Sequence, residues 1–217
     1  MSKSKVLCLH GAHTSGEIFR AQLGQLVPRL EAEQNLELHF IDGLIETEGE
    51  EDMRGMFPEP YYSWCSMSSD KKLVNYESVK QALDFVQDII VEDGPFDGIM
   101  GFSQGAALAL GLLLRYASEH PLDPAYAICK WAVLFSCVEI DREKTQLDDD
   151  SLLSIPSLHV YDQSDSLLGT GGSNVACEPG SAKLILHERG HAIPRDNVTV
   201  NRILDAVQDL QHRAMVF

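Results

Sequence analysis

The chain has 217 residues, of which 44% are hydrophobic, and its formal net charge is −16 at pH 7. A chain of this length and composition is expected to form one globular domain, covering residues 1–217, around a real hydrophobic core. The negative charge argues against binding to nucleic acid or to anionic membrane surfaces, because both would repel an acidic protein.

No segment of the sequence is typical of a secretory leader or of a membrane span. The apolar run Val6–Leu9 is shorter than the roughly 7–15 residues of a leader, and no stretch approaches the roughly 20 apolar residues of a span. The five cysteines include no C-x-x-C pair, and Cys8 and Cys137 lie in apolar runs. We therefore expect reduced thiols and a cytoplasmic protein.

The first part of the chain alternates apolar runs with amphipathic stretches. Residues 6–10 are predicted to form a buried strand, 17–33 a helix with a candidate kink at Pro28, and 36–42 a second strand. Residues 43–75 show no clear periodicity over more than 30 residues. A stretch of that length inside a compact domain is typical of a functional loop or a lid.

The alternation continues to the end of the chain. The expected helices are 76–91, 104–117 and 198–216, and the expected strands are 96–102, 131–137, 157–161 and 182–188. The polar segment 141–154 is predicted to lie on the surface. Strands alternating with helices predict an α/β fold with a mostly parallel central sheet and helices on both of its faces. Such sheets carry their chemistry at the carboxyl ends of the strands.

Residues 101–105 read G-F-S-Q-G and lie between a predicted strand and an apolar helix. That context is typical of a nucleophile elbow. Gly101 and Gly105 permit a tight turn, and the turn presents Ser103 above the sheet. It also places backbone N–H groups at a helix N-terminus, where negative charge is stabilised. We therefore predict that Ser103 is a nucleophile.

Two backbone N–H groups are expected to bind the oxyanion of a tetrahedral intermediate. One belongs to Gln104, the residue after the nucleophile, and the other to the loop 10–16 after the first strand. Within that loop Ala12 is the first candidate, because the turn before it would aim its N–H, and His13 is the second. His10 is expected to order the loop.

An acid and then a histidine are expected after a nucleophile of this kind. The loop after the predicted strand 157–161 carries Asp162 and Asp165. We predict Asp165 as the acid, because a carboxylate further into the loop reaches across more freely, and Asp162 remains the alternative. His191, which follows the next predicted strand, is the expected base.

Residues 187–191 read H-E-R-G-H and match the zinc-protease pattern H-E-x-x-H. That pattern needs both histidines on one face of a helix. His187 ends a predicted strand, Gly190 interrupts the segment, and Pro194 follows, so a helix does not fit. The sequence therefore favours His191 as a proton carrier and predicts no metal and no other cofactor, with a zinc hydrolase as a minor alternative.

Several stretches together resemble the fungal FSH-type small serine hydrolases: L-C-L-H-G-A-H-T-S-G-E-I-F-R-A-Q-L, P-Y-Y-S-W, G-F-S-Q-G-A-A-L-A, the Asp165 loop and G-H-A-I-P-R. The first two stretches are most similar to thioesterases and esterases of the lovastatin-releasing kind, which are encoded with fungal polyketide synthases. The resemblance implies an α/β-hydrolase fold without a large cap domain. It also implies a triad of Ser103, Asp165 and His191. Many relatives have glycine where this chain has Asp162.

The resemblance further implies hydrolysis of an acyl thioester through an acyl-enzyme. The reaction would release or edit a polyketide chain on the acyl-carrier domain of a synthase in fungal secondary metabolism. An acidic carrier domain would be repelled by this chain unless a local basic patch exists, for which Arg20, Arg54 and Arg195 are candidates. Two alternatives remain: a general carboxylesterase acting on small or lipid esters, and a non-catalytic interaction protein.

The candidate side chains for an acyl pocket are mostly aromatic. They are Tyr61, Tyr62, Trp64, Phe102 and Ile193, with Ile18 and Phe19 nearby. For the aromatic residues at 61–64, the alternative is that they only pack the long loop against the rest of the protein.

Overall fold

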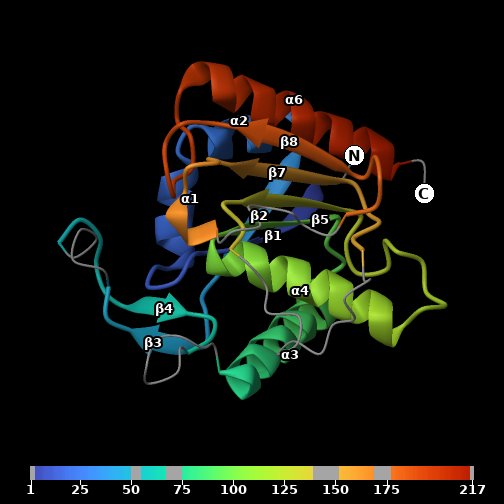
Figure 1. Cartoon of the computed structure of the whole chain (residues 1–217), viewed down its shortest axis with the longest axis horizontal. Coiled ribbons are helices and arrows are strands. Elements are labelled where there is room, and N and C mark those ends of the chain that lie inside the picture. The colour runs from blue at the N-terminus through green and yellow to red at the C-terminus, as the bar shows by residue number, and fades with distance from the viewer. Residues whose placement is uncertain (1–2, 50–54, 67–74, 139–151, 169–176, 216–217) are drawn as a thin grey trace.

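A computed structural model describes residues 3–49, 55–66, 75–138, 152–168 and 177–215 (Figure 1). Its centre is a six-stranded sheet in the order β2-β1-β5-β6-β7-β8, and each neighbouring pair is parallel. The strands are β1 (Ser4–Leu9), β2 (Leu36–Ile41), β5 (Gly98–Phe102), β6 (Trp131–Phe135), β7 (Ser157–Tyr161) and β8 (Ala182–Leu186). The predicted α/β fold with a parallel central sheet is confirmed.

Helices cover both faces of the sheet (Figure 1). They are α1 (Gly16–Leu23), α2 (Leu26–Glu33), α3 (Tyr76–Asp93), α4 (Gln104–Glu119) and α6 (Asn197–Ala214), with a short 3₁₀ turn, η1 (Ser166–Leu168). Successive side chains of β1 point to opposite faces of the sheet and so contact the helices on both sides. Val6 and Cys8 belong to the apolar cluster of α1, α2 and α6, whereas Leu7 and Leu9 belong to that of α3 and α4.

Side-chain caps fix the starts of three helices. Ser15, Asn75 and Asp196 precede α1, α3 and α6, and each side-chain oxygen accepts the backbone N–H three residues further on. These caps satisfy N–H groups that have no acceptor inside the helix. The described residues include no helix with the length and apolar character needed to cross a bilayer.

The structure departs from the sequence-based expectations in two places. The predicted helix 17–33 is two helices, and the break is at Gly24, whose φ is 54°, rather than at Pro28. Pro28 lies in the first turn of α2, where its missing N–H is not needed. The segment 43–75, expected to be irregular, contains an antiparallel pair of strands, β3 (Ile45–Thr47) and β4 (Tyr61–Ser63).

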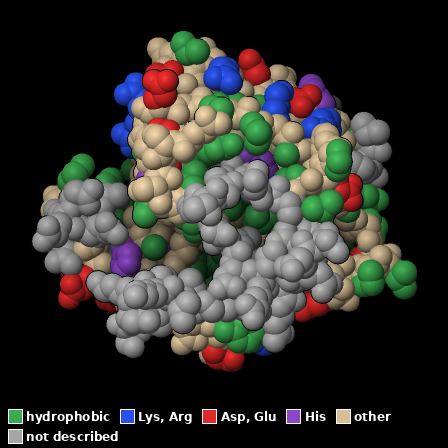
Figure 2. Space-filling model, in the orientation of Figure 1, with side chains coloured by type: hydrophobic (Ala, Val, Ile, Leu, Met, Phe, Trp, Pro, Cys, Tyr) green, Lys and Arg blue, Asp and Glu red, His purple; other side chains and the backbone are tan. Residues whose placement is uncertain are grey.

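Most of the predicted surface segment, residues 141–151, lies outside the described part of the chain. On the face shown in Figure 2, basic and acidic side chains are interspersed over the upper part of the molecule, where α6 runs. This face therefore carries basic side chains although the net charge of the protein is negative.

The imidazole of His159 is buried in the middle of β7 and is only 1% exposed. Its Nε2 lies 3.0 Å from the Ser157 hydroxyl oxygen, and burial lowers its pKa to about 4. The native protein therefore holds this ring neutral at pH values where an unfolded chain would protonate it.

Lowering the pH should destabilise the protein through His159. The unfolded chain binds a proton below its own histidine pKa, about 6.5, while the native ring stays neutral down to about 4. Between these values the free energy of unfolding should fall by up to about 1.4 kcal/mol per pH unit from this group. Urea denaturation from pH 7 to pH 4 should give a shallower pH dependence for His159→Gln, and identical slopes would contradict this account.

Candidate active site

Ser103 lies in the turn between β5 and α4 and has a backbone φ of 52° and ψ of −118°. Residues with a side chain rarely adopt a positive φ, and such strain persists only where the surroundings fix the backbone. Here the Ser103 N–H donates to the Phe135 carbonyl at 2.9 Å, and its carbonyl accepts the Ala107 N–H at 3.0 Å. The predicted elbow is therefore held by β6 on one side and by α4 on the other.

The two glycines of G-F-S-Q-G are needed because backbone atoms lie against them. A Cβ on Gly101 would lie 2.5 Å from the Gly105 carbonyl oxygen. A Cβ on Gly105 would overlap the carbonyl oxygens of Leu9 and His10 at the end of β1. The spacing of the motif thus reflects the close approach of α4 to the sheet.

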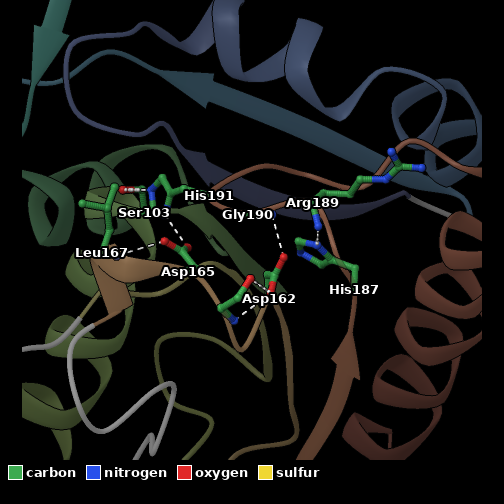
Figure 3. Close-up of polar contacts among 9 residues, drawn as sticks. Ser103, Asp162, Asp165, Leu167, His187, Arg189, Gly190 and His191 are labelled. Carbon is green, nitrogen blue, oxygen red and sulfur yellow. Dashed lines mark hydrogen bonds and ion pairs between the residues drawn. The ribbon is translucent and has the colours of Figure 1, made fainter.

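Ser103, His191 and Asp165 form one hydrogen-bonded chain (Figure 3). His191 Nε2 lies 2.8 Å from Ser103 Oγ, and its Nδ1 lies 2.7 Å from Asp165 Oδ2. The Asp165 side chain is 2% exposed, and its Oδ1 accepts the Leu167 N–H at 3.0 Å. A carboxylate only accepts, so Nδ1 carries the proton and Nε2 is free to accept the proton of Ser103.

The alternative acid, Asp162, takes a different place. Its carboxylate accepts backbone N–H groups of Ser164 and Gly190, whereas the carboxylate next to His191 is that of Asp165. The structure therefore brings Asp165, and not Asp162, to the imidazole of His191.

The segment H-E-R-G-H is not helical. It leaves β8 as a series of bends, and Gly190 adopts a φ of 62°. His187 Nδ1 accepts the Arg189 N–H at 3.2 Å, while both ring nitrogens of His191 are engaged by Asp165 and Ser103. The two histidines do not share the helical face that a zinc protease needs.

Of the N–H groups predicted to bind an oxyanion, Ala12 is favoured over His13. The His13 N–H already donates to Ser63 Oγ at 3.0 Å. Within the described residues, the N–H groups of Ala12 and Gln104 donate to no acceptor. Gln104 is the first residue of α4, whose N-terminus favours negative charge.

The loop that carries Ala12 is organised around His10. The Gly43 N–H donates to His10 Nε2 at 2.9 Å, and the proton on Nδ1 is directed at the Gly11 carbonyl at 2.6 Å. Because Nε2 accepts the Gly43 N–H, it carries no proton, and the ring is neutral with its proton on Nδ1. Burial, which lowers the pKa of His10, favours the same neutral form. These bonds agree with the expectation that His10 orders the loop.

Among the described residues, the aromatic side chains at 61–64 are not part of the lining of the cavity at Ser103, where the sequence analysis expected them. Trp64 is fully buried and its Nε1–H donates to the His10 carbonyl at 2.7 Å. The hydroxyl of Tyr61 donates to the Phe57 carbonyl at 2.7 Å, and the backbone of Tyr62 pairs with Thr14. The buried side chains of Tyr61 and Trp64 and the backbone of Tyr62 therefore pack and pair this segment against the rest of the protein, including the loop after β1.

The side chain of Gln104 also holds this segment. Its Oε1 accepts the Trp64 N–H at 2.8 Å, and its Nε2 donates to the Cys65 carbonyl at 3.2 Å. Sequence reasoning assigned a role only to the backbone N–H of Gln104. The same residue therefore links the elbow to the segment after β4.

A cavity of about 790 Å³ lies beside Ser103. Its lining includes Phe102 and Ile193, as predicted, and also Leu167, which sequence reasoning missed. The two side chains expected nearby, Ile18 and Phe19, are buried in the core instead. Phe102 also packs against the His191 ring, with centroids 5.2 Å apart. Apolar side chains therefore form part of the cavity lining.

Two arginines lie at the same cavity. Arg195, one of the candidates for a basic patch, lines it and donates to the Ala21 carbonyl at 3.0 Å. Arg189 also lines it, and no sequence pattern had pointed to that residue. Arg20 instead pairs with Glu31 at 3.3 Å, and Arg54 lies outside the described residues.

Comparison with known proteins places the chain in a family. Residues 1–203 match the model of the family described as serine hydrolase (FSH1). The chain is 32% identical to hydrolase phiM of Talaromyces stipitatus, over 97% of this chain and 88% of that protein. It is 28% identical to esterase FPY3 of Fusarium mangiferae, over 98% of this chain and 99% of that protein.

A solved structure supports the fold. The crystal structure of a carboxylesterase from Mesorhizobium loti superposes with a TM-score of 0.64 at 18% identity, covering 95% of this chain and 89% of that one. At that identity the likeness shows the α/β-hydrolase fold alone.

Replacing Gly105 by alanine should destabilise the protein by about 1–3 kcal/mol, because the methyl group would overlap the backbone oxygens of Leu9 and His10 at the end of β1. Gly111→Ala, in the same helix, is the matched control, since a Cβ there meets only Leu83 Cδ2 at 3.7 Å. That control should gain up to about 1 kcal/mol from helix propensity. Urea denaturation measures both, and equal losses would contradict the packing argument.

Proposed function

The chain belongs to the FSH1 family of serine hydrolases, and from that premise we propose that it cleaves acyl esters and thioesters through a triad of Ser103, His191 and Asp165. The hydrogen-bonded chain of 2.8 Å and 2.7 Å from Ser103 Oγ to Asp165 carries the proposal. The triad lies at the carboxyl ends of β5, β7 and β8, within what we take to be a single α/β-hydrolase domain.

The proposed reaction begins when Ser103 Oγ attacks the carbonyl carbon of the substrate. His191 Nε2 accepts the hydroxyl proton, and Asp165 stabilises the imidazolium that forms. The N–H groups of Ala12 and Gln104 bind the oxyanion. The tetrahedral intermediate then collapses: the carbon–oxygen or carbon–sulfur bond to the leaving group breaks, and imidazolium donates its proton to the departing oxygen or sulfur, which leaves as an alcohol or thiol. Water, whose proton the same imidazole accepts, attacks the acyl-enzyme, and Ser103 Oγ regains its proton as the acid is released.

The cavity supports an acyl substrate. Phe102, Leu167 and Ile193 offer an apolar wall for a chain, next to the nucleophile. Among the described residues, Arg189 and Arg195 place two positive charges at the same cavity, against one carboxylate, that of Asp196, in a protein of net charge −16. That charge suits a phosphate-bearing leaving group, such as the phosphopantetheine arm of an acyl-carrier domain.

The finer proposal is therefore release or editing of a polyketide chain held as a thioester in fungal secondary metabolism. The similarity of the first strand, its loop and the P-Y-Y-S-W stretch to polyketide-associated thioesterases supports it. A general carboxylesterase is the second candidate, because the relatives include a protein named as an esterase.

Substitution in the triad should abolish hydrolysis of p-nitrophenyl butyrate. We expect Ser103→Ala and His191→Ala to lower kcat by about 10⁴-fold or more, and Asp165→Asn by about 10³–10⁴-fold, with KM little changed. His120→Ala, at the far end of α4, is the histidine control and should retain wild-type kcat. A folded wild-type protein without turnover would favour the non-catalytic interpretation instead.

Arg189 should matter only for a substrate that carries phosphate. We expect Arg189→Gln to raise KM for butyryl-phosphopantetheine by about 2–5-fold, because an exposed ion pair with the phosphate contributes about that much to binding. KM for the butyryl thioester of N-acetylcysteamine, which carries no phosphate, should be unchanged. Steady-state kinetics at low and high salt measure this. Equal effects on both thioesters would contradict the role of Arg189, and a much higher kcat/KM for a butyrate oxygen ester would favour the carboxylesterase.

A further inference from the structure

Asp162, the first residue after β7, is buried although it carries no role in the proposed chemistry; it is 5% exposed. Three donors surround its carboxylate (Figure 3). Oδ1 accepts the Ser164 N–H at 2.8 Å and the Ser164 hydroxyl at 2.7 Å, and Oδ2 accepts the Gly190 N–H at 2.6 Å.

The positions of these donors in the chain are informative. Ser164 directly precedes Asp165, and Gly190 directly precedes His191. One carboxylate therefore holds the residue before the acid with one oxygen and the residue before the base with the other. The two loops leave the neighbouring parallel strands β7 and β8 at the same edge of the sheet.

We propose that Asp162 is a positioning residue, whose carboxylate ties the Asp165 loop to the His191 loop and so sets the geometry of the Asp165–His191 hydrogen bond. The inference rests on the proposed function of those two residues. Asp162 lies outside the lining of the cavity at Ser103, so it acts through the triad rather than on the substrate.

The chemistry of the group suits this role. A carboxylate can accept hydrogen bonds at both oxygens. An amide at the same position would replace one oxygen by an NH₂ group, which would face either the Ser164 or the Gly190 N–H and could not accept from it. The hydrogen bonds from Gly190 and Ser164 hold the pKa of Asp162 at about 2, so the group stays charged at any pH at which His191 can act as a base. The link is therefore permanent rather than switched by pH.

Small displacements of a positioned group are costly in catalysis, and about 1 Å of misplacement can cost on the order of 100-fold in rate. We expect Asp162→Asn to lower kcat for p-nitrophenyl butyrate by about 10–100-fold and to change KM by less than about 2-fold. Ser164→Ala removes only one of the three donors and should cost less than about 5-fold in kcat.

A double-mutant cycle tests whether Asp162 acts through the Asp165–His191 pair. In an Asp165→Asn background, Asp162→Asn should lower kcat by less than about 3-fold further, because the hydrogen bond that it positions is already altered. Asp97→Asn is the matched control, since Asp97 pairs with Lys130 at 2.6 Å at the other end of β5 and should leave kcat unchanged. Equal factors in both backgrounds, or a wild-type kcat for Asp162→Asn, would overturn the proposal.

Proton NMR separates positioning from loss of folding. The far-downfield resonance of the proton between Asp165 and His191 should be present in the wild type and in Asp97→Asn, and lost or shifted in Asp162→Asn and, to a lesser degree, in Ser164→Ala. An unchanged resonance in folded Asp162→Asn would refute the role. If Asp165→Asn keeps wild-type kcat, the proposed triad is wrong. If Asp165→Asn lowers kcat, and Asp162→Asn lowers it by the same factor in both backgrounds, the triad stands and only the positioning role of Asp162 is wrong.

Discussion

The close approach of α4 to the end of β1 is the constraint on which the site depends. It forces the turn between β5 and α4 to be tight, so Ser103 takes a positive φ and residue 105 must be glycine. A strained residue of this kind costs on the order of 1–3 kcal/mol, and here β6 and α4 offset that cost by hydrogen bonds to the Ser103 backbone. The same turn exposes the hydroxyl and leaves the Gln104 N–H at a helix N-terminus.

The parallel sheet supplies the other half of the arrangement. Because the strands of the six-stranded sheet all point the same way, the loops after β1, β5, β7 and β8 lie at the same edge of the sheet. Two carboxylates only three residues apart then have different hydrogen-bond partners. Asp165 accepts from η1 and faces the imidazole, while Asp162 accepts from the two loops themselves. The donors around each carboxylate, rather than its position in the sequence alone, distinguish Asp165 from Asp162.

Much of the fold and the elbow could be predicted because their signals are local. A strand, two glycines and an apolar helix identify the turn at Ser103, and chain order then points to His191. The sequence carries less information on the choice between Asp165 and Asp162, since both lie in one loop and only the course of that loop distinguishes them. The sequence did not reveal that Trp64 would be buried against His10, because the same aromatic residue type can pack a core or line a pocket, and the sequence pattern does not distinguish the two. The helix break at Gly24 had a local signal, because glycine at a positive φ commonly ends a helix, but the apolar spacing that continues across it pointed to one helix. The place of Arg189 at the cavity depends instead on how distant segments come together.

The central claim is that Ser103 is an activated nucleophile, and covalent labelling tests it most directly. Intact protein mass and peptide mapping after reaction with a fluorophosphonate should show a single adduct on Ser103 in the wild type and none in Ser103→Ala. No adduct on folded wild-type protein, or an adduct that persists in Ser103→Ala, would contradict the account.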